Sequence, residues 1–277
     1  MQEQPSTESG VIAVNGVQIA YDLAGEGPAL VLIHAGICDR RMWDNQFATF
    51  ARSHRVLRYD VRGFGASNLP PGSYAHHEDL LALLDAVGVE RATLIAVSMA
   101  GEIALKAALT SPQRVSGLIL STTGAGAVEP SAAVKQLWAE ADAAYEAGDV
   151  AKAVEIEARG WVDGPHRSPV EVDPDVRERV RMMNTALWDR IAREPDAGEE
   201  EEFVPPARER LAEIRVPTLL IVGDLDQPHV VDSMERLAAT IAGAETAVIR
   251  GTAHLPSMER PDEFNRVVLE FLERHRL

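Results

Sequence analysis

Short apolar runs alternate with helical patterns at both ends of this 277-residue chain. Residues 29–34 (ALVLIH), 55–60 (RVLRYD), 93–97 (TLIAV) and 115–121 (VSGLILS) are typical of buried strands, and helical patterns lie between them. The stretch VIAVNGVQIAYDLA at 11–24 predicts two strands joined at Asn-Gly, a strong hairpin turn. Alternation of this kind builds a mostly parallel sheet with helices on both faces. We therefore expect an α/β fold.

The strand signals stop between about residues 124 and 213. Helical segments such as SAAVKQLWAEADAAYEAG and VDPDVRERVRMMNTALWDRIA fill this stretch, and strands then resume with VPTLLIVG. The interruption is too long and too regular for a loop, so we interpret it as a helical lid inserted into one sheet. The predicted division is a core of residues 1–124 and 214–277, with residues 1–10 as a flexible tail, and a lid of residues 125–213.

Composition excludes several classes of partner. The net charge of −16 argues against nucleic acid, because phosphate binding needs clustered Lys and Arg. No apolar run approaches the 18 residues that indicate a membrane span, so no membrane partner is expected. The N-terminus lacks the basic and apolar regions of a signal peptide, and the single cysteine, Cys38, fits a reducing compartment. We predict a cytoplasmic protein.

Two further groups of residues are expected to carry no chemistry. The acidic run EPDAGEEEEF at 194–203 is interpreted as a solvated loop rather than a cation site. No His, Cys, Asp or Glu cluster has the spacing of metal ligands, and no Gly-rich loop is placed to hold a dinucleotide. We therefore expect neither a metal nor an organic cofactor.

The segment ATLIAVSMAGEIAL places Ser98 between a strand and a helix. Such a turn lifts the hydroxyl above the strand ends and directs a helix N-terminus at a reacting carbonyl. The usual pattern is G-x-S-x-G, whereas here Ala96 and Ala100 occupy the glycine positions and Gly101 follows. Taken alone, the segment fits a helix-capping serine better than a nucleophile, so the decision depends on partners elsewhere.

Partners of the required kind follow two later strands. VPTLLIVGDLDQPH brings Asp224 and Asp226 to the end of a strand, and ETAVIRGTAHLP brings His254 to the end of the next. Open α/β sheets place their sites at this edge. A serine nucleophile needs a histidine base, which in turn needs a carboxylate to hold its tautomer. The order Ser, Asp, His therefore predicts that Ser98 is a nucleophile.

Five motifs in order resemble those of a known family. LVLIHAGICDRRMW, YDVRGFGAS, AVSMAG, GDLD and GTAHLPSMERPDEF are similar to α/β-hydrolases of the lid-bearing serine esterase and lactonase type, over about residues 11–124 and 214–275. The segment from RYDVRGFGAS to ALLDAVGVE is especially similar to oxoadipate enol-lactone hydrolases. Esterases and cofactor-free haloperoxidases share this similarity. The resemblance implies an α/β-hydrolase fold with an eight-stranded, mostly parallel sheet and a helical lid after the sixth strand.

The resemblance also implies roles for individual residues. Ser98 would attack a carbonyl carbon and His254 would carry its proton. The family spacing G-x-x-D, counted from Gly223, makes Asp226 the acid, with Asp224 as the second choice.

The same resemblance implies an oxyanion hole, and the predicted lid adds Trp161, between two helical segments, as a residue expected to cover the pocket. The backbone N–H groups of Gly36 and Met99 would form the oxyanion hole. Substrate contacts are expected from Ile37, Trp161 and Leu255.

Three alanines depart from the family pattern. Ala35 replaces the glycine of H-G, and Ala96 and Ala100 replace the elbow glycines. Each adds one methyl group where backbones pass closely, so we expect a slightly shifted elbow. His34 is expected to hold the shape of the oxyanion loop, and Cys38 to be a small buried hydrophobe.

The sequence therefore predicts an enzyme that hydrolyses a carboxylic ester or lactone through an acyl-enzyme on Ser98. Its partner would be a small, largely apolar substrate, because the lid is mostly apolar. The oligomeric state stays open, with a homodimer as one option. Two alternatives remain: the same residues used for perhydrolysis or C–C bond hydrolysis, and a non-catalytic ligand-binding protein on this fold.

Overall fold

The computed structural model describes residues 6–125, 128–194 and 198–277. Its main sheet has eight strands in the order β1-β2-β4-β3-β6-β7-β9-β10. The pairs β1–β2 and β2–β4 are antiparallel, and the other pairs are parallel. The strands are β1 (Thr7–Val14), β2 (Val17–Ala24), β3 (Ala29–Ile33), β4 (Arg55–Tyr59), β6 (Ala92–Val97), β7 (Val115–Ser121), β9 (Thr218–Gly223) and β10 (Glu245–Ile249). The predicted mostly parallel eight-stranded sheet is confirmed.

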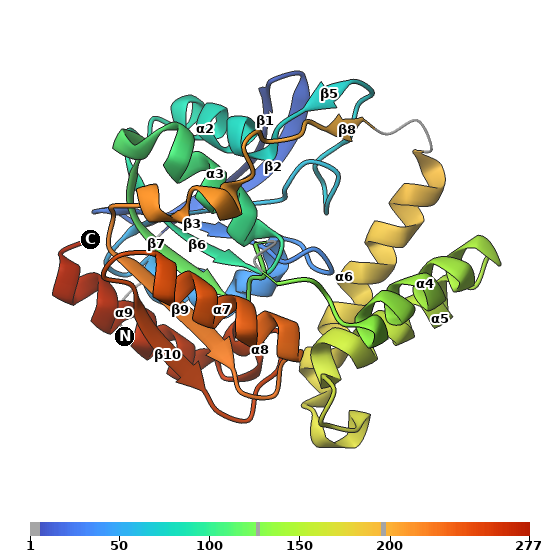
Figure 1. Ribbon diagram of the computed structural model, residues 1–277. Coiled ribbons are helices and arrows are strands. Elements are labelled where there is room, and N and C mark those ends of the chain that lie inside the picture. Colours follow the sequence, from blue (N-terminus) through green and yellow to red (C-terminus); the bar gives the residue numbers. More distant parts are fainter. Residues whose placement is uncertain (1–5, 126–127, 195–197) are drawn as a thin grey trace.

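Helices flank this sheet, as Figure 1 shows. Their bounds are α1 (Asp44–Phe50), α2 (His76–Ala86), α3 (Ala100–Thr110), α4 (Ala132–Glu146), α5 (Val150–Glu157), α6 (Pro174–Arg193), α7 (Pro228–Thr240), α8 (Pro256–Glu259) and α9 (Pro261–His275). Short 3-10 turns lie at Arg40–Trp43, Pro112–Arg114, Pro169–Glu171, Ala207–Glu209 and Leu211–Glu213, and a π-helix spans Ala158–Asp163. Helix α1 packs on α9, and α2 packs on α3. None of the helices in the described ranges is both long and apolar enough to cross a bilayer.

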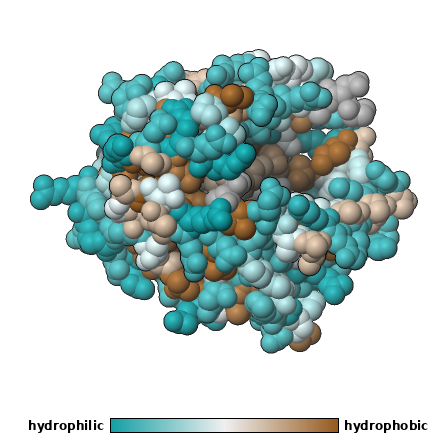
Figure 2. All heavy atoms as spheres, in the orientation of Figure 1, coloured by the Kyte–Doolittle hydropathy of each residue, from teal (hydrophilic) through white to brown (hydrophobic). Residues whose placement is uncertain are grey.

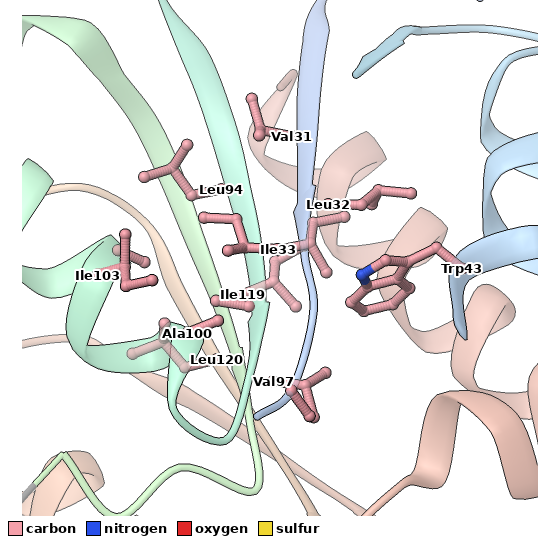
Figure 3. Packing of buried hydrophobic residues seen from close by; sticks show 14 of the residues in the cluster. Val31, Leu32, Ile33, Trp43, Leu94, Val97, Ala100, Ile103, Ile119 and Leu120 are labelled. Carbon is pink, nitrogen blue, oxygen red and sulfur yellow. The ribbon is translucent and has the colours of Figure 1, made fainter. Parts of the chain in front are cut away.

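The central strands β3, β6 and β7 form the core of the molecule. Their apolar runs lack polar alternation because both faces of these strands are covered by helices. Figure 3 shows their side chains packed between Ile103 of α3 and Trp43, both buried. This rigid centre fixes the strand ends, from which the loops of the candidate site project.

The first strand begins earlier than the sequence suggested. Residues 7–10 are not a flexible tail but the first half of β1, which pairs with β2 from Thr7 opposite Ala24 onward. These residues are polar, but one of them makes a side-chain hydrogen bond to the neighbouring strand: Ser9 Oγ donates to Asp22 Oδ1 at 2.6 Å. Residues 1–5 lie outside the described residues. The predicted hairpin at Asn15-Gly16 is confirmed.

The helices α4, α5 and α6 and the π-helix lie between β7 and β9, and we call residues 132–193 the helical insertion (Figure 1). The acidic stretch after it is not simply a solvated loop. Within it, β8 (Glu199–Glu200) pairs in parallel with β5 (Ser73–Tyr74), and Lys106 Nζ donates to Glu200 Oε1 at 3.0 Å. Part of the acidic run is therefore fastened to α3 by an ion pair that the sequence pattern did not indicate.

Candidate active site

Ser98 sits on a strained turn between β6 and α3. Its φ of +58° lies in the left-handed region, which non-glycine residues rarely adopt. Its N–H donates to the carbonyl of Ser121 at 3.0 Å, so the end of the neighbouring strand holds the turn. Ala96 and Ala100 are fully buried beside it, and the core accommodates both methyl groups.

The tightest constraint on this turn falls on Gly101. A Cβ at Gly101 would lie 2.3 Å from Thr123 Oγ1 and 2.5 Å from Thr123 Cβ, distances that real contacts do not allow. The usual pattern G-x-S-x-G places its glycines at positions 96 and 100 instead. The crowding residue, Thr123, follows β7, and no motif in the sequence links it to the elbow.

Ser98, His254 and Asp226 come together in a chain of hydrogen bonds. His254 Nε2 lies 2.7 Å from Ser98 Oγ, and His254 Nδ1 lies 2.8 Å from Asp226 Oδ2. The histidine and the aspartate are 4% and 2% exposed, respectively. With Nδ1–H donating to the carboxylate, Nε2 is the acceptor for the Ser98 hydroxyl, the arrangement that general-base chemistry requires.

The second candidate acid lies elsewhere. Asp224 Oδ1 accepts the backbone N–H of Gly251 at 2.6 Å and has no hydrogen bond to His254 among the described residues. Asp224 thus joins the acid loop (residues 224–227, between β9 and α7) to the histidine loop (residues 250–255, between β10 and α8). Two aspartates with only one residue between them therefore have different hydrogen-bond partners.

Hydrogen bonds also fix the backbone of His254 and of the residue before it. Thr122 Oγ1 donates to the carbonyl of His254 at 2.9 Å, and the N–H of His254 donates to the carbonyl of Trp161 at 3.3 Å. The preceding N–H, that of Ala253, donates to Glu259 Oε1 at 2.8 Å. Sequence reasoning missed Thr122 and Glu259, although Glu259 lies within the quoted motif GTAHLPSMERPDEF.

Gly36 and Met99 are neighbours, as an oxyanion hole requires. A Cβ at Gly36 would lie 3.6 Å from Met99 Sδ, at ordinary contact distance. Within the part of the chain that the structure describes, the N–H groups of Gly36 and Met99 have no hydrogen-bond acceptor. Two free donors beside Ser98 could stabilise a negatively charged oxygen.

His34 holds the loop that carries Gly36. The N–H of Val61 donates to His34 Nε2 at 2.9 Å, so Nδ1 carries the proton and donates to the carbonyl of Ala35, also at 2.9 Å. Burial lowers the pKa of His34, which keeps the ring neutral and Nε2 able to accept. The loop-holding position predicted for His34 agrees with these contacts.

The predicted substrate contacts differ in their surroundings. The Trp161 ring lies against the His254 ring, with centroids 4.6 Å apart and planes at 44°. Ile37 is largely buried, and Leu255 is fully buried, so its side chain has no surface open to a ligand. Cys38 is buried, and burial raises the pKa of its thiol, as expected for a packing residue.

A cavity of about 660 Å³ lies beside the helical insertion. It is bounded by α4, the π-helix and Gln227 of the acid loop, and Ser98 does not line it. In residues 6–125, 128–194 and 198–277, no group of three or more His, Cys, Asp and Glu side chains is placed to hold a metal ion.

Comparison with known proteins places the chain among hydrolases. Residues 28–261 match a family model described as alpha/beta hydrolase fold. The chain is 27% identical over 270 residues to 3-oxoadipate enol-lactonase 2 of Acinetobacter baylyi, covering 95% of this chain and 96% of that protein. It is 27% identical over 279 residues to 2-hydroxy-6-oxo-6-phenylhexa-2,4-dienoate hydrolase of Comamonas testosteroni, with coverages of 92% and 91%. A solved thermophilic esterase from Thermogutta terrifontis superposes with a TM-score of 0.79 at 27% identity, covering 99% of each chain.

Proposed function

The chain belongs to the alpha/beta hydrolase fold family, and on that premise we propose that it is a serine hydrolase acting on a carboxylic ester or lactone. The observation that carries the proposal is the hydrogen-bonded series Asp226–His254–Ser98, with the serine on a left-handed turn. The similar enol-lactonase and esterase support the ester-bond class.

The geometry supports a two-step reaction. As Ser98 Oγ bonds to the carbonyl carbon, its proton passes to His254 Nε2, and the imidazolium is stabilised by Asp226. The N–H groups of Gly36 and Met99 would stabilise the oxyanion until the C–O bond of the leaving group breaks. That leaving oxygen takes the proton from His254. Water, deprotonated by the same nitrogen, then hydrolyses the acyl-enzyme and restores the serine.

Apolar surroundings favour a small, largely apolar substrate. The Trp161 ring lies against the His254 ring at a tilt of 44°, and Trp138 lies next to Trp161, with the centroids of the two indoles 6.3 Å apart. Met99 and Ile37 add apolar surface next to the oxyanion position. Figure 2 shows apolar side chains in the recess beside the helical insertion. Pockets of this kind bind by apolar burial, with a few polar groups that fix orientation.

A fluorophosphonate probe tests the proposal directly, because it reacts with activated serines. We expect labelling of Ser98, identified by peptide mass spectrometry, and turnover of short-chain aryl esters. Ser98→Ala should lose both the label and the turnover. Ser111→Ala, at the C-terminal end of α3 and so at the other end of that helix from the elbow, is the matched control and should keep both. Wild-type turnover in Ser98→Ala would refute the proposal.

C–C bond hydrolysis is the second candidate, and the similar Comamonas hydrolase favours it. The same three residues would then serve a substrate with a ketone carbonyl and a carbon leaving group. Product analysis separates the two reactions. Release of an alcohol or opening of a lactone supports ester hydrolysis, whereas cleavage of a vinylogous diketone into two carbon fragments supports the alternative.

A further inference from the structure

A largely buried arginine joins the helical insertion to the histidine loop. The Arg167 side chain is 9% exposed. It donates to the carbonyls of Val162 at 2.7 Å and Asp163 at 2.9 Å, the last two residues of the π-helix. It also donates to the carbonyl of Gly251 at 3.0 Å and to Glu259 Oε2 at 2.6 Å. One guanidinium therefore satisfies four acceptors from three segments of the chain.

Glu259 carries the connection to the catalytic histidine. While Oε2 accepts from Arg167, Oε1 accepts the N–H of Ala253 at 2.8 Å, and Ala253 directly precedes His254. The carboxylate is itself largely buried, at 6% exposure. Breaking a buried ion pair on one side leaves an uncompensated charge, so the two side chains depend on each other.

The π-helix lies directly on the loops of the site. Gln227 Nε2 donates to the carbonyl of Gly160 at 2.8 Å, and the N–H of His254 donates to the carbonyl of Trp161. At Gly164, which ends this helix, a Cβ would lie 2.7 Å from the carbonyl oxygen of Leu225. The last turn of any helix has carbonyls without intrahelical partners, and here Arg167 supplies donors for two of them.

We propose that Arg167 is a positioning residue for the reaction. Through Glu259 and the π-helix carbonyls it fixes the backbone around His254, so that the imidazole stays between Ser98 and Asp226. It also holds Trp161 against the imidazole. A shift of about 1 Å at a catalytic group costs on the order of a hundredfold in rate. This inference rests on the proposed function, because the reaction that it serves is the one on Ser98.

The helical insertion offers a matched control. Arg190 of α6 also joins the insertion to the core, donating to the carbonyls of Gly65 and Ser67, and its side chain is 17% exposed. These acceptors belong to the turn after β4. Among the residues that the structure describes, Arg190 has no hydrogen bond to the acid loop or the histidine loop. Loss of Arg190 therefore weakens the attachment of the insertion without touching the backbone of His254.

The test compares Arg167→Met, Arg167→Lys and Arg190→Met in the full chain. We expect kcat for an aryl ester to fall about a hundredfold in Arg167→Met and about tenfold in Arg167→Lys, with KM within about threefold of wild type. Arg190→Met should keep kcat within about twofold. A fall in kcat that is equal in Arg167→Met and Arg190→Met, or absent in Arg167→Met, would overturn the proposal.

A second variant and a spectroscopic measurement complete the test. If Arg167→Met does not fold by circular dichroism, Glu259→Gln takes its place, since the amide keeps the shape but supplies only one oxygen acceptor. The low-field proton resonance of the His254–Asp226 hydrogen bond should be lost or displaced in the Arg167 variant and retained in Arg190→Met. Because this resonance requires no turnover, it tests the positioning role even if no ester is cleaved, whereas failure of the proposed function shows in the wild type as absence of labelling.

Discussion

The Trp161 indole and the His254 imidazole lie with ring centroids 4.6 Å apart, and a backbone hydrogen bond from His254 to Trp161 joins the same two residues. Trp161, which belongs to the helical insertion, thus contacts the proposed base both through its ring and through its backbone carbonyl. In the proposed reaction, this indole would form an apolar part of the substrate pocket beside the imidazole.

Truncation of this indole should lower catalytic efficiency. We expect Trp161→Ala to reduce kcat/KM for a short aryl ester by roughly ten- to a hundredfold, since a lost apolar wall is worth about 1.5–3 kcal/mol. Trp161→Phe should retain most of the activity. Trp138→Ala is the control, because that indole is 39% exposed and touches Trp161 rather than His254. Steady-state kinetics measure the effect, and an unchanged kcat/KM in Trp161→Ala would contradict it.

The two aspartates of the acid loop should separate cleanly by mutation. In Asp226→Asn the amide would favour the wrong tautomer of His254, so Nε2 could no longer take the proton of Ser98, and kcat should fall about 10³- to 10⁴-fold. Asp224→Asn keeps an oxygen to accept the N–H of Gly251, so kcat should stay within about threefold. Burst and steady-state assays of both variants provide the comparison. Equal losses would show that the acid is wrongly assigned.

The elbow should tolerate no side chain at position 101. Gly101→Ala should lower the free energy of unfolding by about 1–3 kcal/mol, because the methyl group would overlap Thr123. Thr123→Ala should not rescue it, since the Cβ of residue 123 would remain 2.5 Å away. Urea unfolding followed by fluorescence measures both. Gly124→Ala is the control, with its nearest neighbour at 3.9 Å, and an equal loss there would contradict the steric explanation.

A buried carboxylate in the helical insertion should make stability depend on pH. Burial raises the pKa of Glu157, although Asn184 and Trp188 donate to its Oε2 and oppose the rise. A folded-state pKa above the unfolded one means that the folded protein gains stability as pH falls through that pKa. Above the ordinary pKa of a carboxylate, keeping this group buried therefore costs stability.

Glu157→Gln should therefore raise the free energy of unfolding at pH 7 by about 1 kcal/mol, because the amide oxygen can accept both hydrogen bonds without a charge. The advantage should shrink toward pH 5. Urea titrations at both pH values measure it. Glu171→Gln is the opposite control: hydrogen bonds from Ser168 lower the pKa of Glu171, so its loss should slightly reduce stability at pH 7. If the variant's gain in free energy of unfolding over wild type were smaller at pH 7 than at pH 5, the predicted direction of the pH dependence would be wrong.

The meeting of Ser98, Asp226 and His254 could be predicted from the sequence because each follows a strand end. Parallel strands bring such positions to one edge, so chain order and local pattern suffice. The choice of Asp226 over Asp224 rested on family spacing alone, and the structure supplies the distances. Local pattern also explains the hairpin and the central strands.

Contacts between distant segments could not be predicted in this way. Arg167 lies in a stretch without regular structure, and its four acceptors become neighbours only after the insertion folds onto the sheet. Thr123 is an ordinary strand-end threonine until its closeness to Gly101 is seen. The polar residues 7–10 resemble a disordered tail because the backbone ladder that holds them leaves no mark on composition.

Strands β7 and β9 are immediate neighbours, with Ser121 paired opposite Ile221, so the chain leaves and rejoins the sheet on adjacent parallel strands, out at the end of β7 and back at the start of β9. The helical insertion is therefore closed by the sheet itself, and doubling its length would add only about 0.6 kcal/mol of closure entropy. In this arrangement the helical insertion can be replaced by another one while the strands that precede Ser98, Asp226 and His254 keep their register. Any replacement insertion must supply a cation in place of Arg167 to pair with Glu259. Without that cation, the backbone next to His254 would lose the support that we propose for it.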